Sequence, residues 1–221
     1  MGFDSIIRRL YGWACERLYH ECAGSYDWIS QLVSAGAWPA WRRLALDEVR
    51  GMRVLEIGFG TGGLLVELAE RGGQVWGLEL SPAMQRVAAR RLAGRRLNPP
   101  RVQAPGQAMP FVAGAFDTIV ATFPAPYILA PATLAECGRV LGTAGRLVVV
   151  GLWVTPRLAS LRRWLPLFYA DPAPEQLAAM AQRFTAAGFA VRWRVHASGW
   201  AQVPVLIAEK CAPATELHHD G

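Results

Sequence analysis

The sequence predicts an α/β protein with an open, doubly wound sheet that is mostly parallel. From residue 53 onward, strand-like segments alternate with helical ones, and a Gly-rich turn follows the first strand. The chain ends in two strand-like segments joined by a short turn. With 221 residues, of which 52% are hydrophobic, it can bury one core. We therefore expect a seven-stranded sheet, with five parallel strands and a terminal antiparallel hairpin.

The first fifty residues predict helices that cover this sheet. Apolar residues recur at helical spacing between residues 6 and 18, and further helical stretches run over 26–35 and 40–49. Gly36 and Pro39 separate the last two stretches. We expect three parts: a helical cap over 1–50, the α/β domain over 51–210 and a flexible tail over 211–221.

The α/β part is predicted from alternating strands and helices. The expected strands are 53–57, 74–79, 101–104, 116–121, 145–152, 189–196 and 203–209. Ser81 and Pro82 mark a helix start, since serine caps helix N-termini and proline favours the first helical position. A helix over 174–187 ends at Gly188, and a turn near Ser198 joins the last two strands.

Composition and charge exclude several function classes. The net charge of +6 is dispersed, and no appended nucleic-acid-binding module is visible, so we expect no nucleic-acid partner. The four cysteines form no C-x-x-C pair, so we expect neither a metal site nor a disulfide framework. We expect a cytoplasmic protein, because the sequence has no secretory signal and no apolar run of about 18 residues.

The turn after the first strand predicts a nucleotide cofactor. Gly58, Gly60 and Gly62 let the backbone turn sharply and approach a ligand, and the next helix offers free N–H groups. Because Gly58, Gly60 and Gly63 also fit the dinucleotide pattern G-x-G-x-x-G, the turn alone leaves the cofactor open. Glu56 stands where dinucleotide folds usually keep an apolar residue. Glu79 ends the second strand, where a carboxylate can accept both ribose hydroxyls.

These motifs resemble those of the class I S-adenosylmethionine-dependent methyltransferases, which have a Rossmann-like fold. E-I-G-F-G-T-G is similar to motif I of that family and G-L-E-L-S-P-A-M to motif II. Similar segments follow at A-M-P-F, F-D-T-I-V-A and E-C-G-R-V-L-G-T-A-G-R-L-V-V-V, so the resemblance covers about residues 50–152. It implies S-adenosylmethionine as cofactor, with Glu56 at its amino-acid end beside the glycines and Glu79 on its ribose.

The segment after the third strand departs from that family. The family often places an acidic residue there to receive the adenine amino group, but here Pro105 or its neighbour stands at that position. We expect Gln107 to meet the adenine edge by its side chain or its backbone.

A narrower resemblance lies in the N-terminal part. Ser25-Tyr26-Asp27, followed by Ser34, Gly36, Trp41 and Arg42-Arg43, resembles the leading segment of the quinone-biosynthesis C-methyltransferases, in the methyltransferase type 11 family. Some bacterial phospholipid N-methyltransferases share a similar Tyr-Asp segment. The resemblance implies that Tyr26 lies over the cofactor and helps to close the site.

The loop after the fourth strand is expected to hold the methyl acceptor. Two prolines stiffen it, and we expect Thr122 and Tyr127 to line an apolar pocket. Phe123 replaces the leading Asn or Asp of the N-P-P-Y motif, which argues against methylation of nucleobase amino groups. A carbon or phenol acceptor would want a base. The candidates Asp27, His20 and His196 lie in no telling motif, so no catalytic residue is assigned.

The acceptor class is predicted from a segment that mixes aromatic and basic residues. Trp164, Leu165 and Phe168 stand beside Arg157, Arg162 and Arg163, either as a lid packed on the core or as a peripheral membrane contact. We expect a small apolar or lipid-like acceptor, such as a quinone precursor or a phospholipid headgroup. Two alternatives stay open: an NAD(P)-dependent oxidoreductase and a non-catalytic cofactor-binding module.

Overall fold

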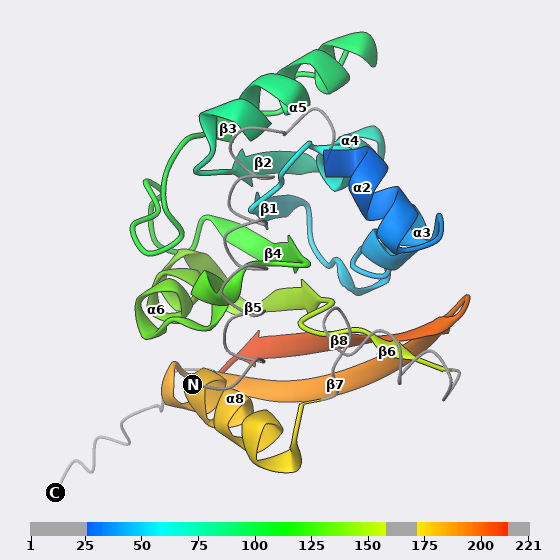
Figure 1. The fold of residues 1–221 in the computed structure, drawn as a ribbon. Helices are drawn as coiled ribbons and strands as arrows, with labels where there is room; N and C mark the ends of the chain where they lie inside the picture. Colours follow the sequence, from blue (N-terminus) through cyan, green and yellow to red (C-terminus); the bar gives the residue numbers. More distant parts are fainter. Residues whose placement is uncertain (1–25, 158–171, 212–221) are drawn as a thin grey trace, which may run out of the picture.

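The computed structural model describes residues 26–157 and 172–211, and their strands form one twisted sheet (Figure 1). Over these residues the sheet has eight strands in the order β3-β2-β1-β4-β5-β8-β6, and β7 pairs with β8. Strands β1 to β5 are parallel. Strand β8 runs antiparallel to β5, and β7 pairs antiparallel with β8 in a hairpin. The strands are β1 (Arg53–Ile57), β2 (Gln74–Leu78), β3 (Arg101–Val102), β4 (Phe116–Thr122), β5 (Leu141–Val150), β6 (Thr155–Pro156), β7 (Phe189–Ser198) and β8 (Ala201–Lys210). The predicted fold class is confirmed, but the predicted number of seven strands is wrong, because the short strand β6 adds an eighth over the described residues.

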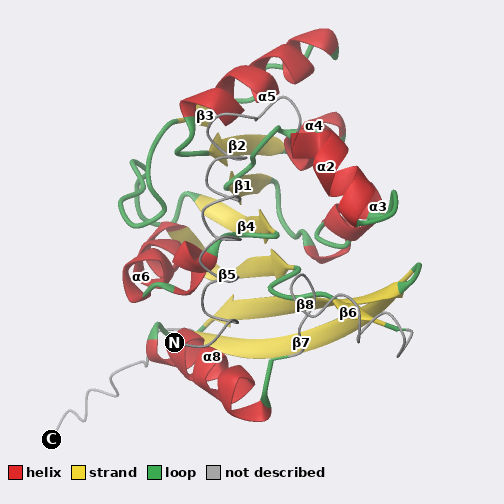
Figure 2. Cartoon of the chain, in the orientation of Figure 1, coloured by secondary structure: helices red, strands yellow, loops and turns green. Residues whose placement is uncertain are grey.

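Helices cover both faces of the sheet (Figure 2). They are α2 (Tyr26–Val33), α3 (Trp38–Arg43), η1 (Leu46–Glu48), α4 (Gly63–Glu70), α5 (Pro82–Gly94), η2 (Pro126–Leu129), α6 (Pro131–Val140) and α8 (Pro174–Ala186). On one face α3, α4 and α5 enclose a core that includes Val54 and Val120. On the other face α6 and α8 pack over Leu55 and Ile119. Neighbouring residues of each strand therefore enter opposite cores, as expected for a sheet buried on both faces.

Several element boundaries differ from the predictions. The expected helix over 40–49 is divided into α3 and the short 3-10 helix η1. The third strand ends at Val102, because its partner β2 ends at Leu78. Strand β5 begins four residues early, at Leu141, across an irregular pairing with β4. Ser81 caps α5 as predicted, by accepting a hydrogen bond from Met84 N at 3.3 Å.

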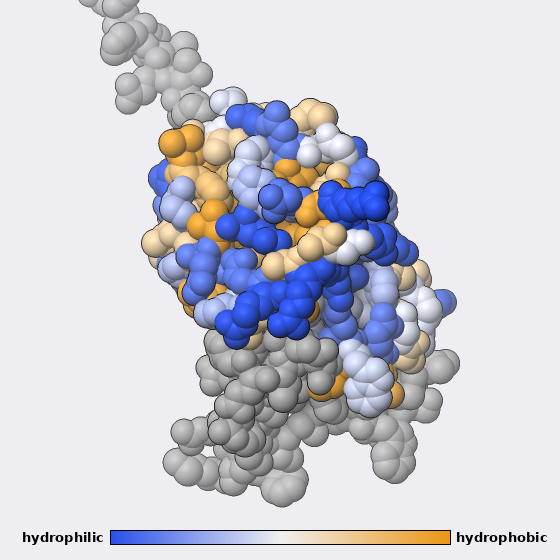
Figure 3. Space-filling model, turned by 90° about the horizontal axis from the view of Figure 1, so that it is seen from above, coloured by the Kyte–Doolittle hydropathy of each residue, from blue (hydrophilic) through white to orange (hydrophobic). Residues whose placement is uncertain are grey.

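This fold decides neither the predicted division into a cap and an α/β domain nor the predicted localisation. The division at residue 50 stays a prediction, although Trp41, Ala45 and Leu46 share one core with the sheet. On the described surface seen from above, hydrophilic residues are interspersed with hydrophobic ones (Figure 3). Within residues 26–157 and 172–211, no helix has the length and apolarity needed to cross a bilayer.

Candidate functional site

The turn between β1 and α4 adopts the conformation that its glycines permit. Gly58, Gly60 and Gly62 have φ values of 66°, 53° and 76°, in the left-handed region that other residues avoid. A Cβ atom on Gly62 would also lie 2.8 Å from the Cβ of Ala88 on α5. Both the turn and the close approach of α4 to α5 thus depend on glycine.

The carboxylate of Glu79 is fixed beside this turn. Its side chain is buried, and Oε2 accepts a hydrogen bond from the Gly60 N–H at 3.0 Å. Oε1 accepts from the Ser81 N–H at 2.8 Å. One carboxylate therefore links the start of α5 to the Gly-rich turn, at the carboxyl ends of two adjacent parallel strands.

Glu56 is buried on the face of β1 that meets α3 and α4. Only 1% of the residue is exposed, and its Oε2 has no hydrogen-bond partner in the part of the chain that the structure describes. Burial raises the pKa of this carboxyl to about 8, with Arg42 opposing the shift and Glu79 and Glu67 adding to it. A buried acceptor without a partner is costly, which marks this position as a place for a donor.

Among the described residues, Arg42 of α3 is the cation whose charge acts on the carboxyl group of Glu56. Its guanidinium lies against the backbone of Gly63, at the start of α4, where a Cβ atom would collide with it. Burial lowers its pKa, and the carboxylates of Glu56, Asp27 and Glu67 oppose that shift. Among the described residues, its Nε atom has no hydrogen-bond partner, and its one ion pair within 4 Å is a long contact of 3.9 Å with Glu67.

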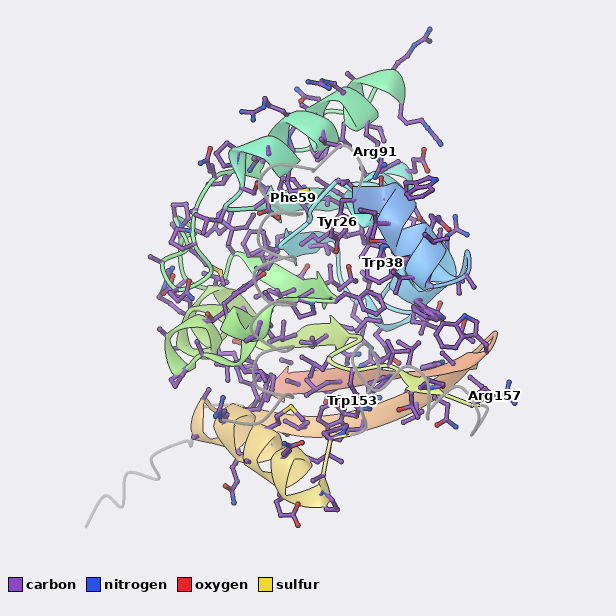
Figure 4. The ribbon with its side chains drawn as sticks, in the orientation of Figure 1. Tyr26, Trp38, Phe59, Arg91, Trp153 and Arg157 are labelled. Carbon is purple, nitrogen blue, oxygen red and sulfur yellow. The ribbon has the colours of Figure 1, made fainter. Side chains whose placement is uncertain are left out.

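Helix α2 is held to the Gly-rich turn by a polar network. Thr61 in the turn donates from Oγ1 to Asp27 of α2 at 2.7 Å. Arg91 of α5 forms an ion pair with Asp27 and donates to Thr61 O and Oγ1 at 3.0 and 2.9 Å. Figure 4 shows Arg91 between α5 and α2, with Tyr26 on the sheet side of α2. The Tyr-Asp segment is thereby brought beside the turn.

Aromatic rings line the region between these helices and the end of β4. The ring of Tyr26 meets Trp38 edge-on at a centroid distance of 6.4 Å. Trp38 packs on Phe123, with centroids 4.1 Å apart and planes 31° apart. Phe123 directly follows β4 and has a φ of 48°, which is uncommon for a bulky residue. The loop after β4 thus presents an aromatic side chain toward helices α2 and α3.

Tyr127 lies on the other side of the same turn. A Cβ atom on Gly58 would lie 2.5 Å from the Tyr127 hydroxyl, and one on Gly106 would lie 3.2 Å from its ring. Burial raises the pKa of this phenol, and the charges of Glu79 and Glu56 add to the effect. The predicted pocket residue Thr122 is half-buried at the end of β4, whereas the predicted adenine contact Gln107 is exposed.

The candidate bases are not gathered at one point. Asp27 is engaged by Arg91 and Thr61. His196 is on β7, which β4, β5 and β8 separate from β1, roughly 19 Å away at about 4.8 Å per strand. His20 lies outside the described residues, as do the predicted membrane-contact residues Trp164, Leu165 and Phe168 with Arg162 and Arg163. Arg157 is exposed and donates to Gly199 O at 3.3 Å.

Several residues of this site were missed by the sequence analysis: Arg42 and Arg91 as partners of acidic groups, Thr61 as an anchor, and Trp38 as an aromatic wall. In the sequence, Arg42 is marked only by the resemblance of the N-terminal segment. Its position in the last turn of an aromatic-rich helix was the available signal.

Comparisons with known proteins agree with this geometry. A family described as "Methyltransferase domain" matches residues 54–145. A demethylmenaquinone methyltransferase from Thermus thermophilus is 36% identical over 222 residues, covering 85% of this chain and 98% of that protein. A ubiquinone/menaquinone biosynthesis C-methyltransferase from Paraburkholderia phymatum is 32% identical over 156 residues, covering 67% of this chain and 64% of that protein.

A solved structure shares the fold. A putative S-adenosylmethionine-dependent methyltransferase from Methanococcus maripaludis superimposes with a TM-score of 0.63 at 18% identity, covering 87% of this chain and 94% of that one. S-adenosylmethionine is therefore the cofactor, and the oxidoreductase and non-catalytic alternatives are set aside. The chain belongs to the class I S-adenosylmethionine-dependent methyltransferases, in the family that includes the quinone-biosynthesis C-methyltransferases.

Proposed function

We propose that this enzyme methylates a ring carbon of an apolar, aromatic quinone precursor. The observation that carries the proposal is the aromatic wall of Tyr26, Trp38 and Phe123 beside the Gly-rich turn. Stacked rings offer a planar acceptor a large apolar contact of defined geometry. The demethylmenaquinone methyltransferase that is similar over nearly its whole length supports the same acceptor class.

The residues of the turn fit the cofactor. S-adenosylmethionine supplies, when bound, a methyl group activated by a sulfonium. We assign Gly58, Gly60 and Gly62 to the backbone that approaches it, Glu79 to its ribose and Glu56 to its amino-acid end. The unpartnered Oε2 of Glu56 and the absence of side chains at the glycines support this fit. Tyr26 is assigned to the cover of the site.

The proposed adenine contact lies in the loop that holds Gly106 and Gln107, and Tyr127 packs beside this loop. Because the side chain of Gln107 is exposed, we propose that Gln107 contacts the adenine edge through its backbone. Tyr127 packs against Gly106 in the same loop and against Gly58 at the turn. We therefore place Tyr127 between the cofactor and the acceptor pocket, as a neutral phenol, because its raised pKa keeps the proton on the oxygen. Thr122 remains a proposed wall of the acceptor pocket.

The protein contributes alignment and water exclusion to the reaction. The hydroxyl groups of a reduced quinone activate its ring carbon as a nucleophile, so orientation in a dry pocket can supply much of the rate. The ring proton that the methyl group replaces is released to solvent. The partners of Asp27 hold it as an anchor of α2. The proposed chemistry therefore assigns no proton-abstracting side chain among the described residues.

The test is methyl transfer from isotope-labelled S-adenosylmethionine to a reduced naphthoquinone that lacks the ring methyl group. We expect the label on a ring carbon, identified by mass spectrometry. Label found only on phosphatidylethanolamine in vesicles would replace this acceptor with a phospholipid headgroup. Vesicle flotation alongside would test the predicted peripheral membrane contact, and protein that stays unbound at low salt would count against it.

The aromatic wall is tested by two substitutions of Phe123. Phe123→Leu keeps apolar volume but removes the ring, and we expect it to raise the acceptor KM about tenfold, as loss of one aromatic contact predicts. Phe123→Tyr keeps the ring and serves as the matched control. Equal acceptor KM values for the wild type and Phe123→Leu would contradict the assignment.

A further inference from the structure

A carboxyl group and a guanidinium group lie near one another at the turn without a direct contact. Glu56 and Arg42 act on each other electrostatically, yet within the described residues no hydrogen bond or ion pair joins them. Each also has one buried polar atom without a hydrogen-bond partner over residues 26–157 and 172–211, Oε2 in the carboxyl group and Nε in the guanidinium. Groups of this kind are expected to pair with something when they are buried.

A simple neutralising pair does not explain this arrangement. If Arg42 served only to compensate the charge of Glu56, direct contact would recover the most Coulomb energy and would satisfy both orphan atoms. Instead the guanidinium lies against Gly63, at the N-terminus of α4. That helix end adds free N–H groups and a positive dipole end beside the guanidinium. One side of the turn therefore favours an anion, and the other side favours a cation.

We propose that Arg42 binds the α-carboxylate of the cofactor's amino-acid end while Glu56 binds its α-ammonium, so that the two side chains together recognise a zwitterion. The proposal rests on the cofactor-binding role given above to the β1 turn. A bound zwitterion satisfies Glu56 Oε2 and Arg42 Nε and bridges the two charges. Arg42 is thus a specificity-determining residue contributed by the cap helix α3.

The experiment combines deletions in the protein with deletions in the ligand. Binding is measured by calorimetry for S-adenosylhomocysteine, for its decarboxylated analogue and for 5′-methylthioadenosine, which lacks the whole amino-acid end. We expect Arg42→Gln to weaken S-adenosylhomocysteine about tenfold to a hundredfold and the other two ligands less than about threefold, since only the first has the carboxylate.

Arg43→Gln is the matched control, because Arg43 is the next residue, is exposed and contacts Glu67 at 2.6 Å. It should leave all three affinities unchanged. Equal affinity of Arg42→Gln and the wild type for S-adenosylhomocysteine would overturn the proposal, and so would a parallel loss of all three ligands. Wild-type protein that binds none of the three would instead contradict the cofactor-binding role of the turn itself.

Discussion

At the scale of single residues, the site contains two buried glutamates, Glu79 and Glu56, which differ in their hydrogen bonds. Glu79 has both oxygens on backbone N–H groups, so its place is fixed before any ligand arrives. Glu56 has an unsatisfied oxygen and a raised pKa. Its burial is costly in the free protein, and a cationic ligand relieves the cost. The same residue type thus serves a preformed contact at one strand end and a ligand-dependent contact at the other.

Cofactor binding should depend on pH through Glu56. Its pKa of about 8 in the free protein leaves it mostly protonated at lower pH, whereas an ammonium ligand favours the carboxylate. Affinity for S-adenosylhomocysteine should therefore rise with pH, by at most roughly tenfold per unit, and level off above about pH 8.

Calorimetry from about pH 6 to pH 8 measures this dependence. Glu56→Gln, which cannot titrate, should show a flat profile and weaker binding. A wild-type profile that is equally flat would contradict the role of Glu56.

At the scale of elements, the cap helices complete a site that the sheet begins. The network of Asp27, Thr61 and Arg91 joins α2, the Gly-rich turn and α5. Because it connects segments far apart in the sequence, it sets where Tyr26 lies. The cap is therefore part of the cofactor site.

Loss of this network should loosen α2. Arg91→Ala removes a partly buried guanidinium that contacts both Asp27 and Thr61, and we expect faster amide exchange in α2 and S-adenosylhomocysteine affinity lowered about tenfold. Arg90→Ala changes the exposed neighbour on the same helix and should alter neither. Unchanged exchange in Arg91→Ala would show that other contacts hold α2.

The close packing of α4 against α5 predicts that a side chain at Gly62 destabilises the protein. Gly62→Ala should reduce the free energy of unfolding by about 1–3 kcal/mol, because φ is 76° and the new Cβ meets Ala88 at 2.8 Å. Ala88→Gly in the same chain should recover part of that loss. Gly94→Ala, at an open position of α5, is the control and should be neutral or stabilising. Equal urea midpoints for Gly62→Ala and Gly94→Ala would contradict the packing argument.

Much of this element order could be predicted, because alternating apolar segments and caps such as Ser81 are local signals. Boundaries that depend on a neighbour could not. Strand β3 stops where β2 stops, and the start of β5 is obscured by Gly142 and Gly145. The placement of Arg42 beside Glu56 could not be predicted for the same reason, since it depends on how α3 packs against α4. Local patterns therefore located the turn but not the residues that the cap adds to it.

At the scale of the whole molecule, a buried ionic cluster ties the N-terminal helices to the C-terminal hairpin. Glu48 of η1 is 4% exposed and pairs with Arg194, which projects from β7, and with Arg192 at 3.3 Å. Arg146 of β5 lies 3.7 Å from Glu48 and 2.7 Å from Glu209 of β8. The two ends of the described chain are thus joined away from the cofactor site.

Removal of Glu48 should destabilise the protein without changing cofactor affinity. Glu48→Ala leaves the buried Arg146 and two further guanidinium groups short of a partner, and we expect a loss of about 2–4 kcal/mol in urea unfolding. Asp47→Ala changes the exposed neighbour and should stay within about 0.5 kcal/mol of the wild type. Equal stability of the two variants would show that the cluster contributes little.

We assign the carboxyl ends of β1 and β2 to the binding of S-adenosylmethionine, and a Glu79 variant tests this assignment. Calorimetric titration of the wild type and Glu79→Ala is performed with S-adenosylhomocysteine, and with NADH as the competing cofactor class. We predict that the wild type binds S-adenosylhomocysteine, that Glu79→Ala binds it at least about tenfold more weakly, and that NADH gives no binding heat. Binding of NADH, or equal affinity of the two proteins for S-adenosylhomocysteine, would contradict the account.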